Sequence, residues 1–179
     1  AVKESSEAFT AFTSPNFPPL AEAGINIRYN TQIINYPASW DAPLEVLSEL
    51  DTRVAVMKLH PGMTPEIVRH FLLGKETRAV ILETYGSGNA PAKEWFLDIV
   101  REAASGGKIL VNVTQCLSGN VDMDIYATGR ALKDAGVICG HDITTESALG
   151  KLFYLMGQHA DNETVKAHLE KNLKGEISK

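Results

Sequence analysis

The fold is decided by two apolar runs, AVILET at residues 79–84 and ILVNVT at residues 109–114. Similar runs cover residues 54–59 (VAVMKL) and, more briefly, residues 137–139 (VIC). Aliphatic and β-branched residues dominate these runs with little polar interruption, which is typical of strands buried on both faces of a sheet. We therefore expect about four buried strands.

Helical patterns alternate with these strands. Residues 64–66 (Thr-Pro-Glu) supply a capping hydroxyl, a tolerated proline and an acid at the positive end of a helix that stops at Gly74. Further helices are predicted from a cap at Asn89 to about residue 105, over about 124–136, from 142–145 to about 156, and from 161 to about 173. Helix-length crossovers return the chain in the same direction. The fold class is therefore α/β, a three-layer domain around a roughly four-stranded parallel sheet.

The first 50 residues have a less regular sequence pattern. Proline and glycine interrupt them repeatedly, and the only regular pattern is the alternation of Ile25, Ile27 and Tyr29 with polar residues. That period of two predicts one short, half-buried strand in an otherwise irregular linker over residues 1–50. Residues 51–179 form the α/β domain in this interpretation. Because the chain opens on Ala1, we expect a piece of a longer protein.

Composition narrows the possible functions. With 44% hydrophobic and 22% charged residues, the chain has a globular and not a disordered composition. A net charge of −5 argues against nucleic acid or an anionic membrane as the main partner. The longest nearly apolar run, residues 149–156, is far shorter than the roughly 20 residues of a membrane span.

The cysteines and acids offer only weak chemical candidates. Cys116 and Cys139 predict a reduced, cytoplasmic setting, and no metal is expected because no second pair of ligands accompanies them. Cys116 and His141 would form a thiol nucleophile and base only if the fold joined them, and no third group is present to orient the base. Asp142 and Glu146 could act as paired carboxylates, but their place at a helix start favours capping and dipole roles.

Two loops at predicted strand ends are alike. TYGSGN at 84–89 and QCLSGN at 115–120 each combine glycine, a hydroxyl and an amide. With a helix start expected just beyond each, such loops would suit a small zwitterion such as an amino acid. The alternative is that glycine and asparagine only make tight turns, which need the same residues. Neither loop contains the six-residue dinucleotide motif or a phosphate-binding loop, so no cofactor is predicted.

Several longer segments, in the right order, resemble the carboxyl-terminal half of type I (cytoplasmic) bacterial L-asparaginases. They read TYGSGNAP (84–91), NVTQCLSG (112–119), YATG (126–129) and AGVI (135–138). SPNFPPL (14–20) and NLKGE (172–176) are similar to the same family, so the resemblance covers nearly the whole chain.

This resemblance implies that catalysis and substrate binding are shared between two domains. Asparaginases convert L-asparagine and water to L-aspartate and ammonia through a threonine in a Thr-Gly-Gly-Thr-Ile motif of an amino-terminal domain, which this sequence lacks. Residues 1–50 then correspond to the linker and the tail end of that domain, and the chain alone is predicted to be inactive. The family also implies a homotetramer built as a dimer of dimers, in which this domain completes the site of a neighbouring subunit.

By similarity, Ser87 and Asn89 would approach the substrate in the partner subunit. Tyr126 matches the position where periplasmic relatives place an acidic residue that meets the substrate amine. A phenol does not supply that charge at neutral pH.

Some type I enzymes also bind asparagine at an allosteric site. The corresponding positions here are Glu83, Asn89, Thr114 and Cys116. Where the regulated form carries an arginine, this chain has Glu83, whose carboxylate would repel the effector carboxylate.

Two other interpretations stay open. The chain could be a freestanding domain that binds a small amino acid, or the asparaginase-like subunit of a tRNA-dependent amidotransferase. The linker-like first 50 residues count against the former, and the acidic composition counts against the latter.

Overall fold

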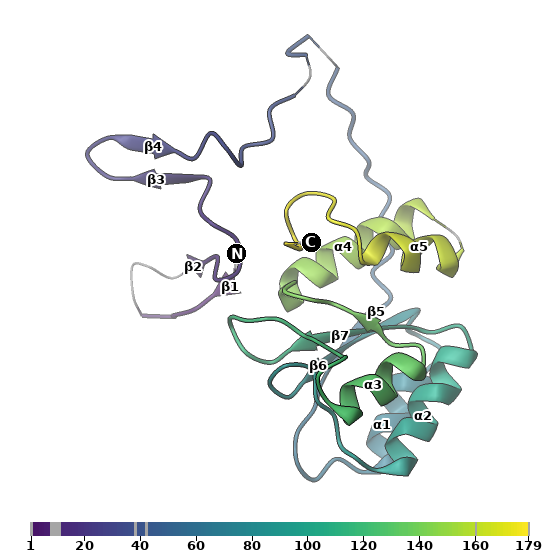
Figure 1. Ribbon diagram of the computed structural model, residues 1–179. Helices are drawn as coiled ribbons and strands as arrows, with labels where there is room; N and C mark the ends of the chain where they lie inside the picture. Colours follow the sequence, from purple (N-terminus) through teal and green to yellow (C-terminus); the bar gives the residue numbers. More distant parts are fainter. Residues whose placement is uncertain (1, 8–11, 38, 42, 160, 179) are drawn as a thin grey trace.

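The computed structural model describes residues 2–7, 12–37, 39–41, 43–159 and 161–178. Its centre is a four-stranded, fully parallel sheet (Figure 1). The strands lie in the order β5-β6-β7-β8 and comprise β5 (Val54–Lys58), β6 (Ala79–Thr84), β7 (Ile109–Thr114) and β8 (Ile138–Cys139). The predicted α/β architecture is confirmed.

Five helices in the described part of the chain cover the two faces of this sheet. One face carries α1 (Pro65–Leu73), α2 (Glu94–Ser105) and α3 (Ala127–Asp134), and the other carries α4 (Thr145–Gln158) and α5 (Asn162–Leu169) (Figure 1). Each strand pairs with the next one along the chain, so right-handed crossovers place α1, α2 and α3 on the same side. The chain covers the second face only after β8. None of the helices in the described ranges combines the length and apolar character needed to cross a bilayer.

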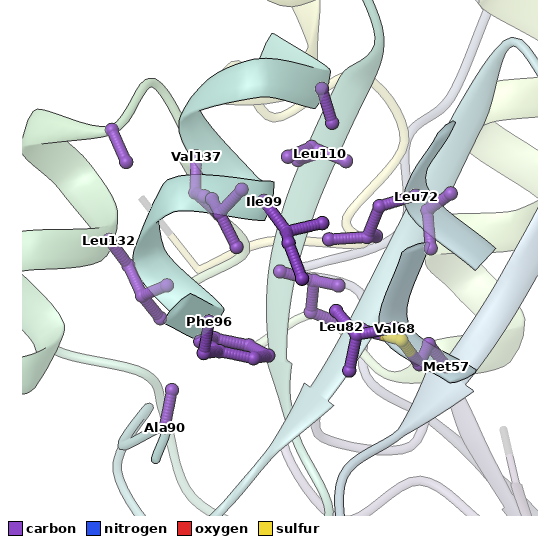
Figure 2. Close-up of a cluster of buried hydrophobic side chains, with 14 of the residues drawn as sticks. Met57, Val68, Leu72, Leu82, Ala90, Phe96, Ile99, Leu110, Leu132 and Val137 are labelled. Carbon is purple, nitrogen blue, oxygen red and sulfur yellow. The ribbon is translucent and has the colours of Figure 1, made fainter. Parts of the chain in front are cut away.

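Alternation along the strands divides the core between the two faces. Val80 and Leu82 of β6 and Leu110 of β7 pack with the helices α1, α2 and α3, and Figure 2 shows Leu82 and Leu110 near Phe96 and Ile99 of α2. The intervening residues, such as Ile81 and Val111, pack against α4 and α5 instead. Helices therefore shield both faces of the sheet from solvent, which explains the uninterrupted apolar runs in the sequence.

Capping side chains place three of the helix starts. The side chains of Thr64, Thr144 and Asp161 each accept a hydrogen bond from the first turn of α1, α4 and α5. The predicted cap at Asn89 is wrong, because α2 begins only at Glu94. Asn89 closes a tight loop with Tyr85 and does not open the helix.

The described residues of the predicted linker, residues 1–50, form two small antiparallel sheets instead of the one predicted strand. β1 (Val2–Lys3) pairs with β2 (Phe12–Thr13), and β3 (Ala21–Ala23) pairs with β4 (Ile27–Tyr29). The prediction of a half-buried strand is wrong, since Ile27 is 57% exposed and every residue of β3 and β4 faces solvent. The hairpin projects away from the α/β domain, so no packed layer lies against its apolar alternation (Figure 1).

Candidate functional site

The loop after β6 is a closed turn at the carboxyl edge of the sheet. The backbone N–H of Tyr85 donates to the carbonyl of Asn89, and the N–H of Asn89 donates back to the carbonyl of Tyr85, both at 2.8 Å. Gly86 and Gly88 adopt φ angles of 51° and 109°, which glycine tolerates best. A β-carbon on Gly88 would lie only 2.6 Å from Val121 Cγ1. Turn geometry and close packing thus account for the glycines of this loop.

A buried amide holds this loop against the sheet. Asn112 of β7 is fully buried, and its Oδ1 accepts a hydrogen bond from Thr84 Oγ1 at 2.6 Å. Its Nδ2 donates to the carbonyl of Gly88 at 3.1 Å. Because buried polar groups are costly unless paired, this network specifies one loop position. The sequence analysis missed this role of Asn112, although an asparagine within an otherwise apolar strand run could have indicated it.

Three of the predicted site residues lie at one corner of the molecule. Thr128 Oγ1 donates to Asn89 Oδ1 at 2.8 Å, and the N–H of Asp122 donates to the carbonyl of Ser87 at 3.0 Å. These bonds join the loop after β6 to the start of α3, where Tyr126 occupies the N-cap position and is 52% exposed. The hydroxyl and amide groups of Ser87, Asn89 and Tyr126 are thereby presented by adjacent segments.

The second loop borders a small cleft. Thr114 Oγ1 donates to the carbonyl of Gly86 at 2.6 Å and accepts from the N–H of Cys116 at 3.0 Å, so the two loops are neighbours. Glu83, Thr114 and Cys116 line a cleft of about 210 Å³ between the strand ends and the start of α4. Asn89 is not among its lining residues, so this predicted set is only partly brought together.

Glu83 is held in place within the small cleft. Its Oε1 accepts a hydrogen bond from Thr145 Oγ1 at 2.7 Å, and its Oε2 lies 4.0 Å from Lys58 Nζ. The side chain is 17% exposed. A carboxylate in this position favours an amine over another carboxylate. The sequence analysis missed that Lys58 and Thr145 contact Glu83, although Lys58 pairs in register with Glu83 in β5 and β6.

His141 and Asp142, which the sequence offered as catalytic candidates, make other contacts in the structure. His141 Nδ1 lies 3.5 Å from Cys139 Sγ, so its ring contacts this cysteine. Asp142 accepts from both the N–H and the hydroxyl of Ser178. α2 and α3 begin at Glu94 and Ala127, so no helix starts just beyond either loop, contrary to expectation. No three His, Cys, Asp or Glu side chains gather as a metal site among the described residues.

A larger cleft, of about 1080 Å³, lies beside the contact between the linker and the end of the chain. Residues 14–21 form one wall, and residues 172–176 with Ser178 form another. Phe17 lies against Gly175, where a β-carbon would come within 3.1 Å of the ring. Two segments that resemble one family, at 14–20 and 172–176, therefore pack against each other.

A buried ion pair fixes the end of the chain. Lys151 of α4 donates from Nζ to the carbonyls of Leu169 and Lys171, at 2.7 and 2.6 Å, and lies 2.8 Å from Glu176 Oε1. Burial alone would raise the pKa of Glu176. The hydrogen bonds from Lys151 and from the N–H groups of Leu173 and Lys174 outweigh burial, and the pKa lies below its usual value.

Comparison with known proteins identifies the family to which this chain belongs. Residues 53–169 match the glutaminase/asparaginase C-terminal domain, and the chain belongs to this family. More narrowly, it corresponds to the carboxyl-terminal half of type I L-asparaginases. It is 43% identical to L-asparaginase 1 of Escherichia coli K12 over 178 residues, which cover 98% of this chain and 51% of that protein. The resemblance inferred from the sequence motifs is confirmed.

Solved structures agree with this assignment. L-asparaginase I from Vibrio cholerae superposes with a TM-score of 0.89 at 43% identity, covering 99% of this chain and 53% of that one. The chain thus spans about half the length of these relatives. A human 60 kDa lysophospholipase is 40% identical over 99% of this chain and 31% of its own length. A glutamyl-tRNA(Gln) amidotransferase polypeptide from Methanothermobacter thermautotrophicus is less similar, at 34% identity over 93% of this chain and 38% of that polypeptide.

Proposed function

We propose that this chain is the carboxyl-terminal domain of an L-asparaginase that converts L-asparagine and water to L-aspartate and ammonia. The observation that carries the proposal is the extent of the match, which takes in 98% of this chain but 51% of the E. coli enzyme. The threonine nucleophile then belongs to an amino-terminal domain outside this sequence. Residues 1–50 act as its linker and tail end, residues 51–179 form the second domain, and the chain alone is inactive.

The contribution of this domain to catalysis is substrate binding across a subunit contact. Ser87, Asn89 and Tyr126 form the corner that meets the substrate of the neighbouring subunit. Support comes from the hydrogen bonds that join the loop after β6 to the start of α3. The assembly is proposed to be a dimer of dimers, in which this corner of one copy faces the catalytic domain of another.

The small cleft around Glu83 is proposed as a second amino-acid pocket with altered preference. Thr114 and Cys116 line it, but Glu83 places negative charge where an effector carboxylate would sit. Asparagine activation by this route is therefore not expected. Calorimetry with L-asparagine on the wild type and on Glu83→Arg tests this. Binding by the variant alone supports the proposal, and tight binding by the wild type at the cleft contradicts it.

The proposed partners are L-asparagine, the amino-terminal domain and further copies of the same protein, in a cytoplasmic setting. No cofactor, nucleic acid or membrane is involved. The amidotransferase alternative is weaker, because the E. coli asparaginase is more similar than the amidotransferase polypeptide. A freestanding amino-acid-binding domain is distinguished by L-asparagine binding to the isolated chain without turnover.

Ammonia release tests the proposal. The purified 179-residue chain is expected to release no ammonia from L-asparagine above background, while the longer protein that contains it turns the substrate over. In the longer protein, Ser87→Ala is expected to raise KM roughly 2- to 10-fold, the worth of one hydrogen bond. Ser105→Ala, at the far end of α2, is the matched control and should leave KM unchanged. Robust turnover by the chain alone would overturn the proposal.

A further inference from the structure

Asn16 connects the linker to the α/β domain through its side-chain amide. Its Oδ1 accepts a hydrogen bond from the N–H of Gly119 at 3.1 Å. Its Nδ2 donates to the carbonyl of Gly119 at 3.2 Å and to the carbonyl of Asp142 at 2.7 Å. One side chain therefore pairs with both polar groups of residue 119, as a neighbouring strand would.

The loop that Asn16 contacts lies at the surface of the molecule. Residues 116–120 are all exposed, and Leu117 presents more than half of its side chain to solvent. The base of the loop is tied at one side by the bond from Cys116 N–H to Thr114 and at the other by the bond from Val121 N–H to the carbonyl of His141. At its tip, the bonds to Gly119 come from Asn16.

Asn16 also lies between the two clefts. It lines both the cleft of about 1080 Å³ beside the linker and the cleft of about 210 Å³ around Glu83, as does Thr144. The wall of the smaller cleft includes Cys116 and Leu117, which belong to the loop that Asn16 grips. Val2, from the same linker, also lines the smaller cleft. Among the described residues, the side-chain amide of Asn16 is the group that links the linker to Gly119 of that loop by hydrogen bonds.

We infer that Asn16 is a positioning residue through which the linker sets the conformation of residues 117–120 and closes the small cleft against the large one. A shift of the polypeptide before the linker then reaches the carboxyl edge of the sheet through the Asn16–Gly119 pair. The inference rests on the proposed function, because the second loop is joined through Cys116, Thr114 and Gly86 to the loop that carries Ser87, which is proposed to meet the substrate L-asparagine.

Amide hydrogen exchange of the 179-residue chain tests the positioning directly. Asn16→Ala is expected to speed exchange of the Gly119 N–H at least about fivefold, because its acceptor is removed. Asn16→Asp keeps an oxygen for that N–H but places a second oxygen against the carbonyls of Gly119 and Asp142, so it should also loosen the loop. Asn35→Ala is the control, since Asn35 lines the same large cleft and is exposed. Unchanged Gly119 exchange in Asn16→Ala would overturn the inference.

A kinetic measurement on the longer protein separates positioning from mere attachment. Asn16→Ala is expected to raise KM for L-asparagine at least about threefold while kcat stays within about twofold and the melting temperature is retained. A KM that does not move although Gly119 exchange has risen would also overturn the inference. If the longer protein shows no asparaginase activity at all, the proposed function fails, and the exchange measurement still decides the role of Asn16.

Discussion

Replacing Lys151 with methionine removes a buried charge while nearly preserving side-chain volume. The Lys151 side chain is 3% exposed and its ammonium group has three acceptors, which are Glu176 Oε1 and the carbonyls of Leu169 and Lys171. The variant leaves the Glu176 carboxylate, 14% exposed, without its cation and two carbonyls without a donor. Breaking a buried pair on one side costs about 3–5 kcal/mol. We expect a loss of that size in the free energy of unfolding.

Equilibrium unfolding in urea, followed by far-UV circular dichroism, measures this loss. Lys166→Met is the matched control, because Lys166 pairs with a Glu163 that is largely exposed and should cost less than about 1 kcal/mol. The double variant Lys151→Met/Glu176→Gln should recover part of the loss, since it removes the stranded charge. A loss below about 1 kcal/mol for Lys151→Met would refute the reasoning that this ion pair anchors the end of the chain.

Three further outcomes are expected. Asn112→Ala leaves the Thr84 hydroxyl with only its 3.3 Å hydrogen bond to the Val113 carbonyl and removes the Asn112 donor of the Gly88 carbonyl. Urea unfolding should therefore show a loss of about 1–3 kcal/mol, and no loss would contradict the network. Gly88→Ala should lower the melting temperature more than Gly62→Ala, because both glycines have positive φ but only Gly88 faces Val121 closely; equal effects would contradict this. The pKa of Glu176 is lowered by folding, so its stabilising contribution is present above about pH 4.5 and is lost as pH falls through the folded value. Glu176→Gln should therefore flatten the acid side of a stability–pH profile, and an unaltered slope would exclude that contribution.

Much of the fold could be predicted because buried strands and capped helices leave local patterns. The strand runs at 79–84 and 109–114 needed no context, and Thr64, Thr144 and Asp161 cap the helices as their positions indicated. The hairpin of β3 and β4 could not be predicted correctly, because alternation reveals a strand but not whether anything packs against it.

The site was predicted less completely, for reasons of geometry. The sequence motifs located Glu83, Thr114 and Cys116, and the structure places them around one cleft. Asn89 turns instead toward Thr128, because the closed loop after β6 directs its side chain to α3. Lys58 reaches the cleft from a different strand. Such contacts between residues far apart in the sequence depend on strand register and loop closure, which no local sequence pattern encodes.

The uninterrupted strand order has a consequence for how the domain is made. Each of β6, β7 and β8 finds its hydrogen-bonding partner in the strand that left the ribosome just before it, with the intervening helix already available to cover the new surface. Assembly can therefore advance with synthesis from one end of the sheet to the other. The face of the sheet that packs against α4 and α5 is covered only after these helices are synthesised. A nascent chain that stalls before residue 145 therefore has one sheet face covered by helices and one apolar face exposed to solvent.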